Sequence, residues 1–269
     1  MIPVSAARPY LTLLVARCRQ ETQYRAAALF GMATQLFWGL VRIAIFTAFL
    51  KAGANRSSMN LTQTITYLWL VQGMIRVMPW SVDADIRNLV REGTVVYELL
   101  RPIDLYLSWY MRAFARHAIP TVMRAIPLFV AAVLLFHMQL PLTVAAGALF
   151  ATAVVLALLL AAAMSTLMSI SLLFTLSGDG IQRIVPAIAN FASGLLIPLS
   201  FLPTTLQHIL RVLPFRDLID TPARLYIGQI GAPEAAAAFA QTVLWTAALA
   251  LFGRFLVLRA SKRMVVHGG

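Results

Sequence analysis

Long apolar runs recur along this chain of 269 residues, and they constrain its fold more than any other feature. A run of about 20 apolar residues is the length that crosses a hydrocarbon core of about 30 Å as a helix. Hydrophobic residues make up 60% of the chain, charged residues make up 12%, and the mean hydropathy is +0.80. A soluble domain carries about 25% charged residues, so this chain has too few to cover a water-exposed surface. The sequence therefore predicts an all-α polytopic membrane protein.

The apolar runs predict six transmembrane helices. The fourth run is 33 residues long, which is about 50 Å as a helix. Because no turn signal divides it, we interpret it as one tilted helix that ends at "SGDG", residues 177–180. No linker separates one part of the chain from another, so residues 1–269 are expected to form a single domain. The predicted spans are residues 26–50, 62–81, 119–136, 142–174, 184–199 and 236–258.

Two segments outside the spans have their own patterns. In residues 6–25, Leu11, Leu14 and Cys18 recur at helical spacing, which favours an amphipathic interfacial helix. An ordinary cytosolic helix is the alternative. Residues 200–235 are too polar and too rich in proline for a simple span. There we expect short re-entrant helices that dip into the outer leaflet or lie on it.

The distribution of basic residues predicts the orientation. With the N-terminus inside, the inside segments hold fourteen Lys and Arg, and the outside connections hold five. Basic residues favour the cytoplasmic side, so we expect both termini in the cytoplasm and the chain in a bacterial inner membrane. The net charge is +12, but the basic residues do not form a basic arm of the kind that binds nucleic acid, so no nucleic-acid partner is expected. Arg112, Arg116 and Arg124 share one helix face, and anionic membrane lipid is their expected partner.

Several kinds of chemistry lack their residues. A P-loop needs a lysine before Ser or Thr, but Lys51 precedes Ala52 and Lys262 precedes Arg263. The histidines are far apart, and a single cysteine excludes a cysteine metal cluster. Acidic residues lie only in connections or at span edges, which argues against intramembrane acid chemistry. We therefore expect no catalytic residue, no metal site and no cofactor in this chain.

Polar side chains inside spans are costly, so each is a functional candidate. Arg42 lies near the middle of the first span, about 12 Å by helical rise from Leu50, which is a long reach for snorkelling. Structural hydrogen bonds between helices are the alternative. The candidates for lining a translocation pathway are Gln35, Trp38, Arg42, Trp69, Gln72, Arg76 and Asn190.

A dense charged segment, residues 83–102, follows the second span and is expected to be cytoplasmic. "DADIRNLVREG" predicts a short amphipathic helix that Gly93 ends, and a second helical piece ends at Pro102. Apolar residues ringed by both charge signs are typical of a docking site for a soluble partner. A solvated interfacial loop is the alternative. The candidate docking residues are Asp83, Asp85, Ile86, Arg87, Leu89, Val90, Arg91, Glu92 and Gly93.

The order of these segments resembles the type-2 permease subunits of ATP-binding-cassette (ABC) exporters, in the small bacterial six-span branch. The motifs that carry the resemblance are "TITYLWL" in the second span and "LPFRDLIDTPARLYIG" before the last. A third is the pattern Ile86, Gly93, Leu99, Leu100, Arg101 and Pro102.

The resemblance implies that two permeases, identical or sister subunits, form a pathway. It also implies that separate ATPase subunits bind ATP and Mg, and that residues 83–102 couple their movement to export. An amphipathic compound, a peptide or a lipid-like molecule would be the substrate. An ion-coupled secondary carrier or a non-transporting scaffold or sensor are the alternatives.

Overall fold

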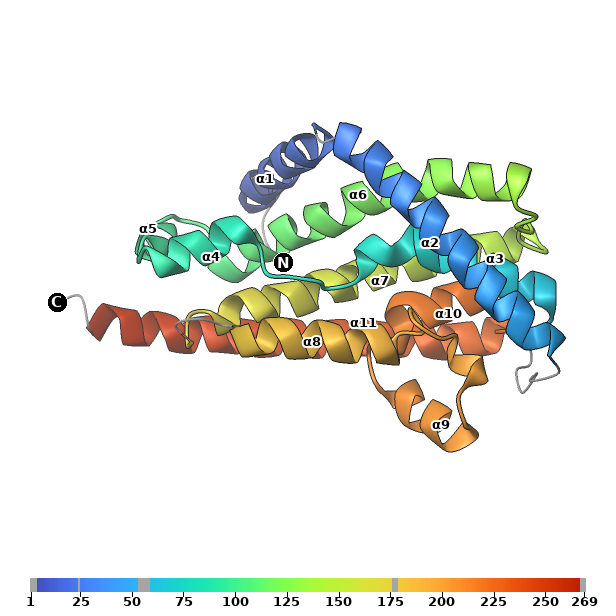
Figure 1. Ribbon diagram of the computed structural model, residues 1–269. Helices are drawn as coiled ribbons and strands as arrows, with labels where there is room; N and C mark the ends of the chain where they lie inside the picture. Colours follow the sequence, from blue (N-terminus) through green and yellow to red (C-terminus); the bar gives the residue numbers. More distant parts are fainter. Residues whose placement is uncertain (1–3, 24, 53–58, 176–178, 267–269) are drawn as a thin grey trace.

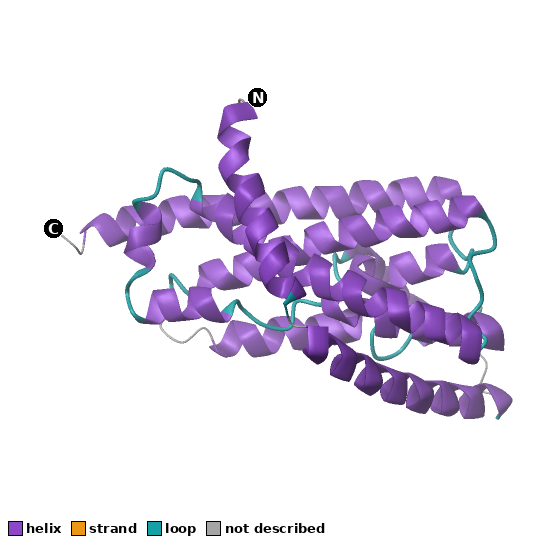
Figure 2. Ribbon diagram, turned by 90° about the horizontal axis from the view of Figure 1, so that it is seen from above, coloured by secondary structure: helices purple, strands orange, loops and turns teal. Residues whose placement is uncertain are grey.

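The structure, a computed structural model, describes residues 4–23, 25–52, 59–175 and 179–266. Within these ranges the chain consists of helices joined by loops, and no strand occurs there (Figure 2). The elements are α1 Val4–Thr22, α2 Arg25–Lys51, α3 Leu61–Met74, η1 Ile75–Val77, α4 Ala84–Arg91, α5 Val95–Leu99, α6 Leu105–Leu135, α7 Val144–Ser171, α8 Asp179–Ala192, η2 Leu199–Phe201, α9 Thr204–Val212, α10 Arg216–Tyr226 and α11 Ala232–Val266.

Four of the described helices are long and apolar enough to cross a membrane. They match the predicted first, third, fourth and sixth spans, and α7 confirms that the long fourth run is one helix. α6 begins at Leu105 rather than at residue 119, because Asp104 accepts a hydrogen bond from Leu107 N and caps the helix there. The four apolar segments are Phe30–Lys51 in α2, Leu105–Leu135, Val144–Ser171 and Ala232–Ser261 in α11.

The predicted second and fifth spans correspond to shorter helices. α3 and α8 have 14 residues each, or about 21 Å, where a crossing takes about 20 residues. α8 covers Asp179–Ala192 instead of residues 184–199, because the chain turns at Gly194, whose φ is +83°. Four of the six predicted crossings therefore correspond to helices of sufficient length, and the total of six stays a prediction.

α7 is the central helix of the bundle. It packs against α6, α10 and α11, and Figure 1 shows it lying along α11. Ala157, Ala161 and Ala162 on α7 are fully buried. Such small side chains let neighbouring helices approach closely within a membrane.

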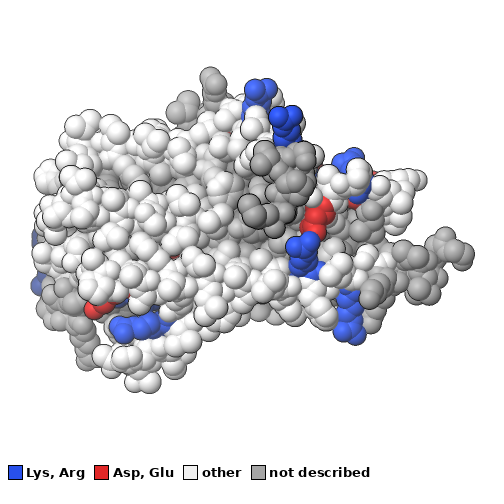
Figure 3. Space-filling model, turned by 180° about the vertical axis from the view of Figure 1, so that it is seen from behind, with Lys and Arg blue, Asp and Glu red and all other residues white. Residues whose placement is uncertain are grey.

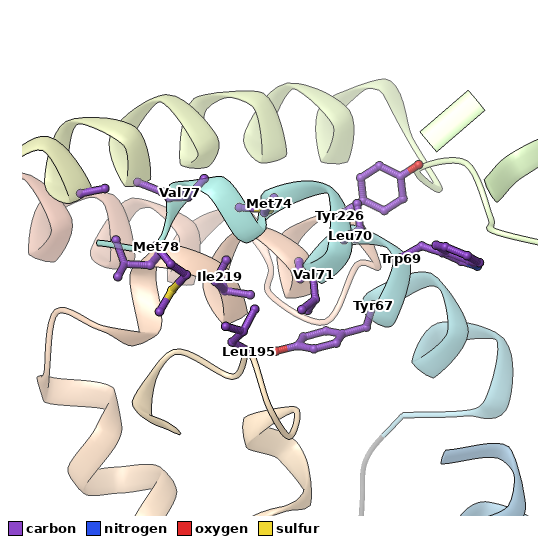
Figure 4. Close-up of a cluster of buried hydrophobic side chains, with 14 of the residues drawn as sticks. Tyr67, Trp69, Leu70, Val71, Met74, Val77, Met78, Leu195, Ile219 and Tyr226 are labelled. Carbon is purple, nitrogen blue, oxygen red and sulfur yellow. The ribbon is translucent and has the colours of Figure 1, made fainter. Parts of the chain in front are cut away.

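α3 forms the other part of the core, with Tyr67, Trp69 and Leu70 fully buried. Figure 4 shows the Tyr67 ring pointing toward Leu195, while the Trp69 ring points away from Leu195. α2 crosses over α3 so closely that a Cβ at Gly39 would lie 2.6 Å from the Trp69 ring. A glycine is therefore required at this helix crossing.

The two segments predicted outside the spans contain helices. α1 packs along α6, and its position at the membrane surface stays a prediction. Residues 200–235 hold most of η2, all of α9 and α10, and the start of α11. Figure 1 shows α9 standing away from the bundle, whereas α10 packs against α7. On the face shown in Figure 3, charged side chains gather toward the two ends and leave a wide uncharged area between them.

Candidate functional site

The first candidate region is the charged segment that α4 and α5 form. Asp83 caps α4 by accepting a hydrogen bond of 2.9 Å from Asp85 N. Asp85 lies in the first turn and Arg91 in the last, which complements the helix dipole. Gly93 has a φ of +72° and ends the helix, as the sequence predicted.

Arg112 on α6 holds this segment in place. Its side chain is only 6% exposed, and its Nη2 lies 3.0 Å from Asp85 Oδ2. Arg112 Nε lies 3.7 Å from Asp83 Oδ2, and Nη1 lies 3.9 Å from Glu98 Oε1 on α5. Trp109 Nε1 donates to the other Glu98 oxygen at 3.0 Å. We call Arg112, Asp83, Asp85 and Glu98 the Arg112 cluster.

The expected lipid contact of Arg112 is therefore wrong. The i, i+4 spacing correctly placed Arg112 and Arg116 on one helix face, but there Arg112 meets the charged segment of the same chain and Arg116 meets Ser81, just before that segment. Arg112 binds carboxylates, and Arg116 donates to the carbonyl of Ser81. Helical spacing shows which residues share a face, and it contains no information about what covers that face.

α4 also reaches two other helices. Arg17 Nη1 on α1 lies 3.3 Å from Asp85 Oδ2, and Arg87 Nη2 donates to Gln182 Oε1 on α8. Polar contacts thus join α4 to α1, α6 and α8.

The inner side of α1 is partly shielded from water near these contacts. Burial raises the pKa of the Glu21 carboxyl, while the guanidinium groups of Arg116 and Arg76 oppose the shift. Burial also raises the pKa of the Cys18 thiol, and the nearby Glu21 charge adds to this. Cys18 therefore stays a protonated thiol at neutral pH and is a poor nucleophile.

The apolar side chains of α4 face inward, contrary to their predicted place on a docking surface. Ile86 is 1% exposed and belongs to a cluster with Trp109 and Ile170, against which Leu89 and Val90 also pack. The amphipathic pattern is real, but its apolar side is used within the chain. Outward side chains include Arg91 at the end of α4 and Glu92 directly after it, together with Val96, Tyr97 and Leu100 on and after α5.

The second candidate region is a groove between α2 and the segment 195–202. Its cavity has a volume of about 580 Å³, and we call it the α2 groove. Trp38 and Arg42, two predicted pathway residues, line it together with Ile45, Phe49 and Phe201.

The other predicted pathway residues lie elsewhere. Gln35 and Gln72 are buried. Neither Oε1 of Gln35 nor Nε2 of Gln72 forms a hydrogen bond with a described residue. The Trp69 ring packs 5.1 Å from that of Phe136. The Arg76 carbonyl lies 2.8 Å from His117 Nδ1, and Asn190 on α8 is partly exposed. None of these five lines the α2 groove.

A buried polar network was missed by sequence reasoning. Tyr67 donates to Asp220 Oδ1 at 3.0 Å, and Arg216 Nε lies 3.4 Å from Asp220 Oδ2. Asp220 N donates to the Ser193 carbonyl at 3.0 Å. This network joins α3, the turn at Gly194 and α10. Tyr67 and Asp220 are 153 positions apart in the sequence, and no local pattern marks such a distant pair.

Metal ligation can be checked over the described part of the chain. There, no group of three or more His, Cys, Asp or Glu side chains is placed to hold a metal ion.

Comparison with known proteins places the chain in a family. A model described as "ABC-2 family transporter protein" matches residues 36–268. No curated protein matches the chain. The family match covers α2 from residue 36 onward, the other three long apolar helices, the charged segment and the α2 groove. The chain therefore belongs to the ABC-2 family of transporter proteins and is a transmembrane permease of an ABC transporter.

Proposed function

We propose that this permease works as a dimer in an exporter, and that a separate ABC ATPase docks on α4 and α5. The observation that carries the proposal is the Arg112 cluster. A solvated loop would not need a buried arginine that holds carboxylates of two short helices against a long membrane helix. The cluster joins both short helices to α6, so a force on the segment would be passed to that helix.

Movement of α4 would be shared among several helices. Asp85 contacts Arg112 on α6 and Arg17 on α1, and Arg87 contacts Gln182 on α8. Closure of the ATPase pair after ATP and Mg binding would press on α4 and displace these helices together. That displacement would open the pathway between the two permeases.

The ATPase would contact the outward side of the segment. Val96, Tyr97 and Leu100 are 46%, 69% and 76% exposed, so they offer apolar area for a partner to bury. Arg91 and Glu92 lie beside them and would fix the register by charge complementarity.

Substrate, direction and topology form the finer part of the proposal. We propose export of an amphipathic, peptide or lipid-like compound across a bacterial inner membrane, with both termini in the cytoplasm. The excess of basic residues on one side supports this orientation. An ion-coupled carrier needs ionisable groups that are free to load ions, whereas buried Asp220 is paired with Arg216 and Tyr67, and buried Asp217 accepts a hydrogen bond from Thr221.

The proposal is tested by identifying what binds the chain. We would extract tagged chain from its native membrane in mild detergent and determine by mass spectrometry which proteins co-purify. A stoichiometric P-loop ATPase is expected with the unchanged chain, and much less with Leu100→Ser. Leu140→Ser is the matched control, because Leu140 is also exposed, at 67%, but lies in the loop between α6 and α7.

Absence of any ATPase under conditions that preserve other membrane complexes would contradict the proposal and favour a carrier or scaffold. Equal ATPase recovery with Leu100→Ser and Leu140→Ser would place the docking surface elsewhere.

A further inference from the structure

The α2 groove combines an apolar lining with one cation. Trp38, Ile45 and Phe49 on α2 are 54%, 60% and 47% exposed, and Leu196 across the groove is 49% exposed. Its volume of about 580 Å³ falls within the range of small-molecule sites, about 300–1,000 Å³. The groove is therefore large enough, and apolar enough, for the body of a small amphiphile.

Arg42 is the charged residue of this groove, and its charge is not compensated by the described part of the chain. Its Nη1 donates to the Leu195 carbonyl at 2.6 Å. A guanidinium carries five N–H donors, yet no described carboxylate forms an ion pair with Arg42. The carbonyl contact instead holds the guanidinium between α2 and residues 195–202, where it faces the cavity.

At this depth Arg42 is held by a backbone carbonyl, and no described carboxylate balances its positive charge. Arg42 lies within the long apolar segment Phe30–Lys51, and charge in a hydrocarbon region is costly unless it is paired. Among the four long apolar helices, α2, α6 and α7 of a second copy contain no Asp or Glu, and α11 has an acidic residue, Glu234, only in its first turn. A ligand that brings its own anion fits the groove better than a protein helix does.

We propose that the α2 groove binds an amphiphile with a single anionic group, and that this amphiphile is the transported substrate. The anionic group would accept hydrogen bonds from Arg42, and the apolar body would lie along Ile45 and Phe49. Trp38 would lie beside the bound molecule. This inference rests on the proposed exporter function and adds the charge of the substrate and the residue that selects it.

Binding can be measured through Trp38, because bromine quenches tryptophan fluorescence at short range. The full chain, with the proteins that co-purify, would be placed in a bilayer of neutral phosphatidylcholine. Two probes with the same alkyl tail and head groups of opposite charge would be titrated, 11-bromoundecyl sulfate and 11-bromoundecyl trimethylammonium. Trp38→Phe identifies the part of the quenching that comes from the groove.

We expect the sulfate to quench Trp38 at about tenfold lower concentration than the trimethylammonium probe. Arg42→Gln should weaken sulfate binding about tenfold, which is the effect of about 1.4 kcal/mol. Arg42→Lys should retain most of the selectivity because it retains the charge. Arg124→Gln is the matched control: Arg124 is a partly buried arginine on α6 whose guanidinium lies against Gly31, outside the groove. Its binding curves should resemble those of the unchanged chain.

Equal quenching by the two probes would overturn the inference, and this comparison uses the unchanged chain, so it does not depend on the folding of a variant. Unchanged sulfate binding in a folded Arg42→Gln protein would overturn it as well. If Trp38→Phe leaves the quenching intact, the probe binds outside the groove, and the inference fails.

A second measurement connects binding to transport and separates the two proposals. In the complex with its ATPase, the sulfate probe should stimulate ATP hydrolysis, and Arg42→Gln should lose this stimulation. Without stimulation, the bound amphiphile is not the substrate, and the inference fails. If no ATPase co-purifies but the sulfate binds selectively, the exporter function fails while the anion site remains. If an ATPase co-purifies and both probes bind alike, the exporter function remains and this inference fails.

Discussion

Gly194 and Tyr67 should be energetically coupled, and the coupling can be worked out from the geometry. Gly194 has a φ of +83°, a conformation that costs an L-residue about 1–2 kcal/mol. A Cβ there would lie 2.5 Å from the Tyr67 hydroxyl and 3.2 Å from Asp220 Cβ. Overpacking of this kind costs about 1–3 kcal/mol. We therefore expect Gly194→Ala to lower the free energy of unfolding by about 2–5 kcal/mol.

Tyr67→Phe removes the hydrogen bond to the Asp220 carboxylate, which should cost about 1.5–3 kcal/mol. It also removes the oxygen that would overlap with a Cβ at residue 194. The three atoms nearest to that Cβ lie within 3.4 Å of it, and none of them is a ring carbon of Tyr67, so the phenylalanine ring would leave the Cβ more room. In a chain that already carries Tyr67→Phe, Gly194→Ala should therefore retain its backbone strain and lose most of its overlap. The double variant should be about 1–3 kcal/mol more stable than the sum of the single costs predicts.

The measurement is reversible unfolding in mixed micelles, followed by tryptophan fluorescence, for the four proteins of a double-mutant cycle. Gly228→Ala is the matched control, because Gly228 has a φ of +73° but its added Cβ would meet Leu142 instead of Tyr67. Gly228→Ala and Tyr67→Phe should be additive. Additivity of Gly194→Ala and Tyr67→Phe within about 0.5 kcal/mol would refute the reasoning.

Three other perturbations test the charged segment. Arg112→Gln should destabilise the packing of α4 by about 1–3 kcal/mol and reduce transport, because Asp85 is partly solvated but Arg112 is buried. Hydrogen exchange of α4 amides measures this, and unchanged exchange would contradict it. Gly93→Ala should lower the free energy of unfolding by about 1 kcal/mol because of the φ of +72° alone, since nothing lies near the added Cβ. Gly180→Ala, within helix α8, should instead raise it by up to about 1 kcal/mol. Equal effects of the two substitutions on unfolding would refute the strain argument. Replacing Arg91 or Glu92 should uncouple transport while membrane insertion stays intact, and normal transport by both variants would exclude them from coupling.

The long helices could be predicted because their signal is local. Apolar length alone identifies α2, α6, α7 and α11, and the turn chemistry of Gly93 identifies the end of α4. α3 and α8 were harder, because their apolar patterns continue beyond the residues that are helical. The chain leaves α8 at Ala192 because of a turn that the Tyr67 and Asp220 contacts stabilise, and those contacts join distant parts of the sequence.

The charged segment shows a second limit of sequence reasoning. Its two short helices were predicted, but the direction of the apolar face of α4 was not. An amphipathic pattern shows that a face is covered, and it leaves open whether the same chain or a partner covers it. Ile86 meets α6 and α7 of its own chain. In the groove, sequence reasoning identified Trp38 and Arg42, while the opposite wall, Leu196 and Phe201, has no polar residue to mark it.

The two prolines of α6 give this helix the mechanics of a jointed rod. Pro120 and Pro127 lie inside its 31 residues, and each removes a backbone hydrogen-bond donor. Arg112 is on one side of both prolines and is fixed to the charged segment. Phe129 is on the other side, where it packs against Gly73 of α3. A push at Arg112 would therefore be taken up partly as bending near the two prolines, so that the Arg112 end of α6 would move further than the end where Phe129 packs against α3.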